Sequence, residues 1–191
     1  MSWAIWITGA PGCGKTTIAR AVAKELASRG IGVKLLEMDR LRQILTPEPT
    51  YKTEERELVY RALVLMAKLL TEAKVPVIID ATGHRRAWRE LARSLIPIFA
   101  EVQLTCPVEI CTKRERARPL GYAPPGVYTY ATRPGATVPG VNVPYEVAVN
   151  AELVIDTHTT RVSSAVQEIL YLARRLHNLA LLRPYRVGPT G

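Results

Sequence analysis

Short apolar runs rich in β-branched residues alternate with longer helical patterns along this chain, and the alternation limits the folds that it can adopt. Each apolar run is nearly continuous, as in strands that are buried on both faces of a sheet. The pattern predicts an α/β fold in which helices cover both faces of a parallel sheet. The five expected strands are Trp3–Thr8, Val33–Glu37, Val75–Asp80, Phe99–Thr105 and Glu152–Ile155.

One long segment interrupts the alternation. Residues 118–144 contain six of the fourteen prolines and four of the twelve glycines. An irregular segment of this length inside a compact domain is usually a functional loop or lid, although a passive surface loop is the alternative. We expect one domain over residues 1–182, a lid over about residues 112–144 and a flexible tail at residues 183–191. The expected helices are Lys15–Ser28, Arg40–Leu45, Thr53–Ala73, Arg86–Leu95, Pro107–Arg116 and Thr160–Leu179.

Charge narrows the choice of partner. The 26 basic and 17 acidic residues give a net charge of +9, which favours an anionic partner such as a nucleotide, a nucleic acid or an acidic membrane. No apolar stretch is long enough to span a membrane and no cleavable signal is evident, so we expect a cytoplasmic protein without membrane contact.

The three cysteines lack CxxC spacing, which favours reduced thiols over a disulfide between Cys106 and Cys111.

An eight-residue motif joins the first expected strand to the first expected helix. It matches the pattern GxxxxGK[ST] and reads Gly9-Ala10-Pro11-Gly12-Cys13-Gly14-Lys15-Thr16. Its glycines let the backbone turn successive N–H groups toward phosphate oxygens, and the helix N-terminus adds partial positive charge. We expect Lys15 to neutralise the β- and γ-phosphates of a nucleotide, Thr16 to ligate Mg²⁺, and Thr17 to complete the nucleotide site. A glycine-rich turn without a ligand would leave Lys15 and Thr16 unexplained.

Two carboxylates follow the next two strands in the sequence. Asp39 lies just past the second expected strand, where it can accept a proton from an attacking hydroxyl or cap the helix that follows. Asp80 ends the third expected strand, where a carboxylate can hold Mg²⁺ through water or serve as a turn residue. The NKxD signal of guanine-specific switch proteins is absent. These acids favour a kinase over a GTPase.

The segment around Asp39 resembles the adenylylsulfate kinases, which transfer the ATP γ-phosphate to the 3′-hydroxyl of adenosine 5′-phosphosulfate. Residues 36–42, Leu-Glu-Met-Asp-Arg-Leu-Arg, are similar to that family's LDGDNVR. The resemblance implies that Asp39 is the catalytic base and that Arg42 binds substrate. The family's Asp-Gly pair is replaced here by Glu37 and Met38.

The two segments that would bind the phosphate acceptor resemble the family only in part. Residues 55–59 align with the family's DRxEN, so a substrate-contacting arginine falls on Arg56, while Val59 replaces the neighbouring asparagine. Residues 80–89 align with SFISPYRxxR and keep both arginines, but not the Phe-Ile-Ser-Pro that shapes the substrate pocket. A site built around a hydrogen bond rejects molecules that lack it, so changed contacts can mean a changed acceptor.

The lid and the last strand also resemble the family. Residues 126–128 are similar to its KGLY, with Pro125 where that motif has lysine, and the lid before Gly126 is longer than the family's. Residues 140–146 are similar to TGIDxPYE, and residues 151–157 to the strand that follows. The resemblance implies that Arg114 and Thr157 bind ATP.

The resemblance implies a three-layer α/β/α fold of the P-loop NTPase type, with ATP and Mg²⁺ as cofactors and a small anionic nucleotide as substrate. In the first hypothesis the chain phosphorylates adenylylsulfate for sulfate activation. In the second it is a kinase of the same fold that acts on another nucleotide-linked metabolite, a small molecule or a polynucleotide end. A nucleic-acid-binding module is a third reading, which the 6% aromatic content disfavours. The sequence does not decide whether the protein forms a homodimer.

The resemblance also implies the residues of the site. The implied catalytic residues are Asp39 and Lys15, and the implied substrate-binding residues are Asp39, Arg42, Arg56, Thr82, Gly83 and Val127.

Overall fold

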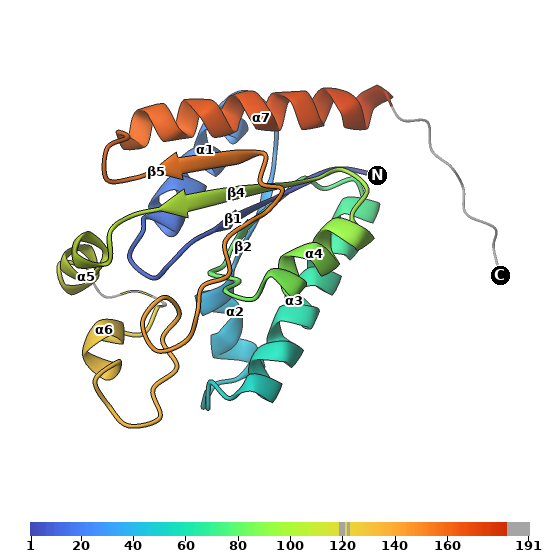
Figure 1. Ribbon diagram of the computed structural model, residues 1–191. Helices are drawn as coiled ribbons and strands as arrows, with labels where there is room; N and C mark the ends of the chain where they lie inside the picture. Colours follow the sequence, from blue (N-terminus) through green and yellow to red (C-terminus); the bar gives the residue numbers. More distant parts are fainter. Residues whose placement is uncertain (119–120, 122, 183–191) are drawn as a thin grey trace.

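A five-stranded parallel sheet forms the centre of the computed structural model, which describes residues 1–118, 121 and 123–182. The strand order is β2-β3-β1-β4-β5, and every neighbouring pair is parallel (Figure 1). The strands are β1 (Ala4–Thr8), β2 (Lys34–Glu37), β3 (Val77–Asp80), β4 (Phe99–Thr105) and β5 (Leu153–Asp156). The predicted α/β fold with a parallel sheet is therefore confirmed, and each strand overlaps the run expected from the sequence.

Helices cover both faces of this sheet. Side chains alternate along β1, with Ile5 and Ile7 in one core cluster and Ala4 and Trp6 in the other. Helices α1 and α7 cover the first face, and α3 and α4 cover the second (Figure 1). The helices are α1 (Lys15–Ser28), α2 (Met38–Leu45), α3 (Thr53–Glu72), α4 (Arg86–Leu95), α5 (Val108–Arg116), α6 (Val127–Tyr130) and α7 (Val162–Leu182). All the expected helices are present within a few residues of their predicted ends, and α6 was not expected.

The ends of three strands meet at one edge of the sheet. Asp80, the last residue of β3, is in register with Glu37 at the end of β2 and with Ile7 near the end of β1. Because β1, β2 and β3 are parallel neighbours, the loops that follow them emerge side by side. The motif of residues 9–16 and the two carboxylates are thereby brought to the same edge, as expected for ligand sites in open α/β sheets.

The described residues of the segment 118–144 lie beyond this edge, after α5 ends at Arg116 (Figure 1). Apart from α6 and one isolated bridge between Pro139 and Val143, the described part of this segment is irregular, as its proline content predicted. The part of the expected lid at residues 112–116 belongs to α5, and the expected tail at residues 183–191 lies outside the described residues.

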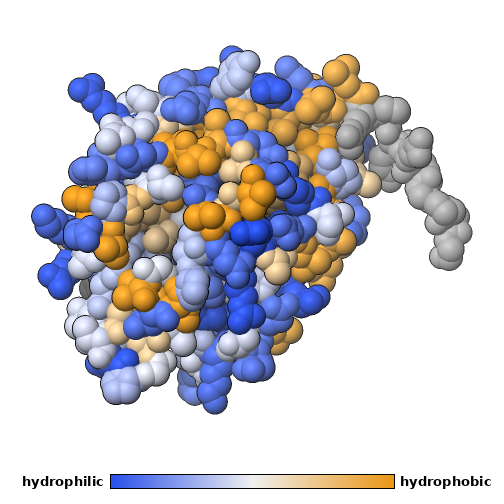
Figure 2. Space-filling view, in the orientation of Figure 1, coloured by the Kyte–Doolittle hydropathy of each residue, from blue (hydrophilic) through white to orange (hydrophobic). Residues whose placement is uncertain are grey.

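Hydrophilic residues and smaller apolar patches share the surface in the view of Figure 2. Within the part of the chain that the structure describes, no helix combines the length and the apolar content that a membrane span requires. The three cysteines are free thiols, of which Cys13 and Cys111 are buried and Cys106 is half-buried. This agrees with the predicted reduced state.

Candidate active site

The loop between β1 and α1 depends on glycine for its path. Gly9 and Gly12 have φ angles of 147° and 77°, which side-chain-bearing residues rarely adopt. A Cβ atom on Gly12 would lie 2.4 Å from the carbonyl oxygen of Cys111, and one on Gly9 would lie 2.6 Å from that of Leu104. The loop is thus packed against β4 and α5 so closely that only glycine fits at these two positions.

Lys15 lies inside this loop. Its buried Nζ donates hydrogen bonds of 3.0 Å to the carbonyl oxygens of Gly9 and Ala10. Burial acts to lower the pKa of the ammonium group, but Cys13, Asp80 and Asp39 act against it, and the pKa is raised above its ordinary value. Lys15 is therefore positively charged at neutral pH and held where the loop encloses a ligand.

Thr16 and Asp80 supply neighbouring oxygen atoms. Burial raises the pKa of the Asp80 carboxyl group to about 6, although the charge of Lys15 and the nearby Thr16 hydroxyl oppose that shift. Hydroxyl and carboxylate oxygens are ligands that Mg²⁺ accepts, usually together with substrate phosphates and water. The described residues contain no group of three His, Cys, Asp or Glu side chains that could hold a metal ion. The pair therefore fits Mg²⁺ that is bound partly by a nucleotide.

Asp39 is the second residue of α2, and this position tests one of the two roles expected for it, the helix cap. The N-cap of α2 is Glu37, which makes no side-chain capping bond, so the capping alternative for Asp39 is wrong. Burial raises the pKa of Asp39, while the charges of Lys15, Arg118 and Arg42 lower it. Asp39 in turn influences Lys15 and Asp80. The structure thus gathers the loop lysine and both predicted carboxylates at one site.

The two predicted acceptor arginines are engaged with protein groups. Arg42 is buried and its Nη1 lies 2.7 Å from Glu55 Oε1. Arg56 Nε donates to the Tyr51 carbonyl oxygen at 2.8 Å, and its Nη2 donates to the carbonyl oxygen and hydroxyl of Thr137 at 2.8 and 3.0 Å. Arg56 therefore joins α3 to the far part of the lid.

Tyr51 is a site residue that sequence reasoning missed. Its ring lies under both guanidinium groups, 5.0 Å from the Arg42 Cζ and 5.6 Å from the Arg56 Cζ. It also has a positive φ of 55°, and its backbone N–H donates to Glu55 Oε1 at 3.2 Å. The sequence carries no signal for this placement beyond an aromatic residue shortly before a helix.

The β3–α4 loop holds the predicted residues Thr82 and Gly83. The Thr82 carbonyl oxygen accepts a 2.6 Å hydrogen bond from the Thr8 hydroxyl, and Gly83 N–H donates to the Tyr60 hydroxyl at 2.9 Å. Gly83 has a φ of 49°, and a Cβ there would lie 2.9 Å from the Trp6 ring. Val59 is buried in the apolar cluster on the same face of the sheet, so it offers this loop no polar contact.

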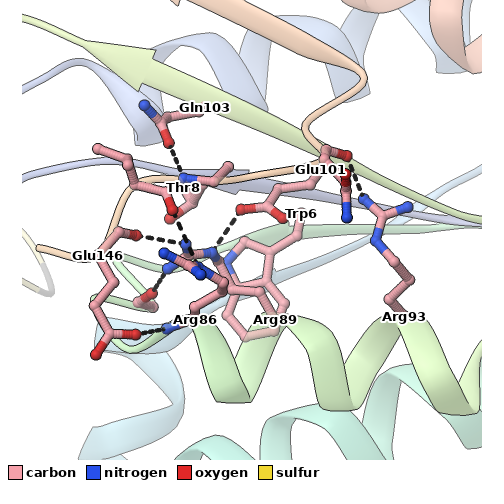
Figure 3. A network of polar contacts seen from close by, with 12 residues as sticks. Trp6, Thr8, Arg86, Arg89, Arg93, Glu101, Gln103 and Glu146 are labelled. Carbon is pink, nitrogen blue, oxygen red and sulfur yellow. Dashed lines mark hydrogen bonds and ion pairs between the residues drawn. The ribbon is translucent and has the colours of Figure 1, made fainter.

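Arg86 and Arg89 are the two arginines kept from the family motif, and both make their contacts with protein groups. Figure 3 shows Arg89 pointing at Glu101, to which its Nε donates at 2.5 Å, while its other nitrogens donate to the carbonyl oxygens of Gly83 and Glu146. Arg86 N–H donates to Glu146 Oε2 at 2.6 Å. This network fixes the segment after the lid against the β3–α4 loop.

The predicted ATP-side residues Arg114 and Thr157 are in direct contact. Arg114 donates through Nη1 to the Thr157 hydroxyl at 3.1 Å and through Nη2 to its carbonyl oxygen at 2.8 Å. The Thr157 hydroxyl donates to the Cys13 carbonyl oxygen at 2.9 Å. Both residues therefore support the phosphate-binding loop, whereas Thr17 is exposed in the first turn of α1.

One lid side chain that was not among the predicted site residues is anchored to the phosphate-binding loop. Val127, predicted to bind substrate, opens α6, and the N–H groups of Gly126 and Val127 face Glu115 Oε1 at 2.8 and 3.3 Å. The Tyr128 hydroxyl donates to the Pro11 carbonyl oxygen at 2.7 Å. Tyr128 belongs to the motif that resembles KGLY, and that motif was the available signal.

Comparisons with known proteins agree with this arrangement. The family model described as adenylylsulphate kinase matches residues 1–156. A probable adenylyl-sulfate kinase of Archaeoglobus fulgidus is 41% identical over 160 residues, which cover 82% of this chain and 97% of that protein. The adenylyl-sulfate kinase of Lactiplantibacillus plantarum is 31% identical over 180 residues, which cover 93% and 84% of the two chains.

Solved structures show the same fold. The chain resembles the Mycobacterium tuberculosis APS kinase CysC in complex with AMPPNP and APS, with a TM-score of 0.79, 26% identity and coverage of 91% of this chain and 98% of that one. A sugar kinase from Janibacter, 19% identical with a TM-score of 0.67 and coverage of 94% and 98%, shares the fold alone. With the sequence matches spanning most of its length and the phosphate-binding loop and both carboxylates in place, the chain belongs to the adenylyl-sulfate kinase family.

Proposed function

We propose that this protein transfers the γ-phosphoryl group of ATP to the 3′-hydroxyl of adenosine 5′-phosphosulfate. The observation that carries the proposal is the convergence of Lys15, Asp39 and Asp80 at one edge of the sheet, between the phosphate-binding loop and the two acceptor arginines. The relative from M. tuberculosis, which was solved with AMPPNP and APS, supports the same pair of substrates.

The chain's own residues supply positioning and charge for this reaction. The glycine loop would hold the phosphates, and Lys15 would neutralise charge on the β- and γ-phosphates. Asp39 would orient the acceptor hydroxyl and take its proton, and its raised pKa brings it closer to the operating pH, which favours a general base. Arg42 and Arg56 would hold the anionic part of the acceptor in place of Glu55 and Thr137, their present partners.

Mg²⁺ would be held by the Thr16 hydroxyl and, through water, by Asp80. When bound, it would neutralise charge on the transferred group. The Thr16 hydroxyl lies near enough to lower the pKa of the Asp80 carboxyl group, and the buried Asp80 carboxylate would gain a counter-ion there. Removing divalent ions with a chelator is expected to abolish turnover.

A coupled ADP-release assay tests the proposed function. Mg-ATP is supplied with adenylylsulfate, AMP, other nucleoside phosphates, a set of sugars or a 5′-hydroxyl oligonucleotide. Saturable turnover selective for adenylylsulfate is expected. Tight ATP binding without turnover on adenylylsulfate would refute the proposal.

A kinase acting on a different small-molecule hydroxyl is the second candidate, and one observation favours it. Val59 is buried among apolar side chains where the family has asparagine, and Ala81 replaces a phenylalanine in the same cluster. These two positions therefore depart from the family pattern, Val59 in polarity and Ala81 in side-chain volume. Turnover on another member of the same substrate panel would establish this candidate. A cytoplasmic location, a homodimer and the action of about residues 112–144 as a lid stay predictions.

A further inference from the structure

Two carbonyl groups of the phosphate-binding loop are held by hydroxyl groups from distant parts of the chain. The Pro11 carbonyl oxygen accepts the Tyr128 hydroxyl at 2.7 Å. The Cys13 carbonyl oxygen accepts the Thr157 hydroxyl at 2.9 Å. In a trans peptide the N–H points away from the carbonyl of the same unit, so each hydroxyl also orients the N–H group of the residue that follows.

Those N–H groups belong to Gly12 and Gly14, and both are unused donors. Among the described residues, neither N–H donates to a protein group. N–H groups that converge from such a loop bind phosphate oxygens, and they bind more tightly when the loop already has its bound shape. The hydroxyls of Tyr128 and Thr157 are therefore placed to influence nucleotide binding.

Glu115 holds the helix that carries Tyr128. Its side chain lies in the last turn of α5 and is only 2% exposed. Glu115 Oε1 accepts the N–H groups of Gly126 and Val127, where α6 begins, at 2.8 and 3.3 Å. Tyr128 follows in the same four-residue helix. The carboxylate therefore sets where the Tyr128 hydroxyl lies relative to the Pro11 carbonyl.

Helix α5 also meets the phosphate-binding loop directly. A Cβ on Gly12 would lie 2.4 Å from the Cys111 carbonyl oxygen, so the loop and the helix backbone are in close contact. Arg114, the residue before Glu115, donates to Thr157 through both Nη atoms. Two adjacent side chains of α5 thus hold the two hydroxyls that fix the loop, Arg114 directly and Glu115 through α6.

The second carboxylate oxygen of Glu115 has no role in stabilising the fold. Oε2 is buried and accepts no hydrogen bond within the part of the chain that the structure describes. A buried polar atom without a partner destabilises the folded state, and such an atom in a native protein needs a reason other than stability. The contact of Oε1 with α6 supplies that reason if the position of α6 matters for binding.

We propose that Glu115 is a positioning residue for nucleotide binding. It acts through α6 and Tyr128 to hold the Pro11–Gly12 peptide with its N–H toward the phosphates, and it does not touch the nucleotide itself. The inference rests on the proposed function only for the bound nucleotide, so it is independent of which hydroxyl is phosphorylated.

Calorimetric binding of ADP by E115A, E115Q, Y128F and the double variant E115A/Y128F tests the proposal. Y128F should raise the Kd for ADP about 3-fold to 10-fold, the effect of one lost hydrogen bond, and E115A should raise it at least 3-fold. E115Q should stay within about 2-fold of the unmodified protein, because its amide oxygen still accepts both N–H groups. The double variant should bind no more weakly than E115A, since both changes remove the same contact with Pro11.

Two variants on the same helices serve as matched controls. Glu109 is exposed in the first turn of α5, and Tyr130 is 44% exposed at the end of α6. E109A and Y130F should bind ADP like the unmodified protein. If E115A does not fold, E115D replaces it in the cycle, because it keeps the charge but withdraws the carboxylate by one methylene group.

The Kd, compared with the melting temperature, separates positioning from a merely structural role. A lower melting temperature of E115A with a Kd within about 2-fold of the unmodified protein overturns the proposal. Kd effects of E115A and Y128F that multiply in the double variant also overturn it, because Glu115 would then not act through Tyr128. If the unmodified protein binds ADP but does not phosphorylate adenylylsulfate, the proposed function fails while the role of Glu115 is still decided.

Discussion

At Asp39, burial and neighbouring cations act on one carboxylate in opposite directions. Burial raises its pKa, whereas Lys15, Arg118 and Arg42 hold the rise in check. The Asp39 carboxylate therefore accepts a proton more readily than an exposed aspartate does. This balance is what a general base in a phosphoryl-transfer site requires.

Replacing Asp39 with asparagine tests this role. D39N keeps the shape of the side chain but removes the proton acceptor, so kcat is expected to fall on the order of 100-fold to 10,000-fold. The Kd for ATP should change little, because Asp39 lies on the acceptor side of the site. Stopped-flow turnover and calorimetric ATP binding provide the two measurements. Unchanged turnover would remove Asp39 from the mechanism.

His84 makes the stability of the protein depend on pH. It is buried beside Trp88, its Nδ1 has no hydrogen-bond partner among the described residues, and burial lowers its pKa to about 4 from an ordinary value of 6.5. Above pH 6.5 the ring is neutral in both the folded and the unfolded chain. As pH falls from 6.5 toward 4, only the unfolded chain takes up the proton, so stability is lost across this window.

Denaturant unfolding of the unmodified protein and of H84F at pH 7.5 and pH 4.7 measures this effect. The unmodified protein should lose about 2 kcal/mol more than H84F on going to the lower pH. Asp80, whose pKa is about 6, titrates in the same window with the opposite sign, and comparing the two proteins cancels its contribution. Glu55, whose pKa is lowered to about 2, loses its stabilising effect only below pH 4.5 and does not interfere. Parallel pH curves for the two proteins would refute the prediction.

At the scale of elements, the strands and long helices were predictable because each is encoded locally. Continuous apolar runs mark β1 and β3, and the motif of residues 9–16 locates the turn from β1 into α1. The observed ends of the elements differ from the predicted ends by a few residues, because tertiary hydrogen bonds, and not propensity, decide where a strand ends.

Other parts of the site were not predictable, because they depend on contacts between distant segments. Helix α6 has only four residues and follows Gly126, whose N–H is held by the Glu115 carboxylate eleven residues earlier. The pairing of Arg56 with Thr137 joins residues 81 positions apart. The sequence places an arginine at such a position but does not specify its partner.

The buried ion pair between α4 and β4 shows what such contacts contribute to stability. Arg89 is fully buried, and it joins Glu101 of β4 to the β3–α4 loop and to Glu146 (Figure 3). Removing one partner of a buried pair leaves an uncompensated charge, so R89M is expected to destabilise the protein by about 3–5 kcal/mol. The double variant with E101Q should lose less than the sum of the two single changes, because the orphaned carboxylate is gone. Urea unfolding of the four proteins completes the cycle, and strict additivity would show that the pair is not coupled.

At the scale of the whole molecule, the net charge of +9 and the clustered cations of the site have different consequences. Overall charge attracts any anion at low salt, including nucleic acid, and this attraction weakens as salt rises. The nucleotide site instead relies on the buried Lys15 inside a loop of fixed shape, where salt screens the interaction much less. Ligand binding at physiological salt therefore separates a nucleotide-dependent enzyme from a nucleic-acid-binding module.

Thermal unfolding with and without ligands measures this difference. A ligand present at about 100 times its Kd stabilises the folded state by about 2.7 kcal/mol, which corresponds to a rise in Tm of roughly 5–10 °C for a chain of this size. Mg-ATP should produce this shift at 0.15 M salt, and a 20-nucleotide single strand should produce none. K15M should lose the ATP shift, because the buried ammonium that meets the phosphates is gone, whereas R133M on the outer lid should keep it. A shift with the oligonucleotide that persists in K15M would mean that the basic surface, and not the loop, is the principal binding site.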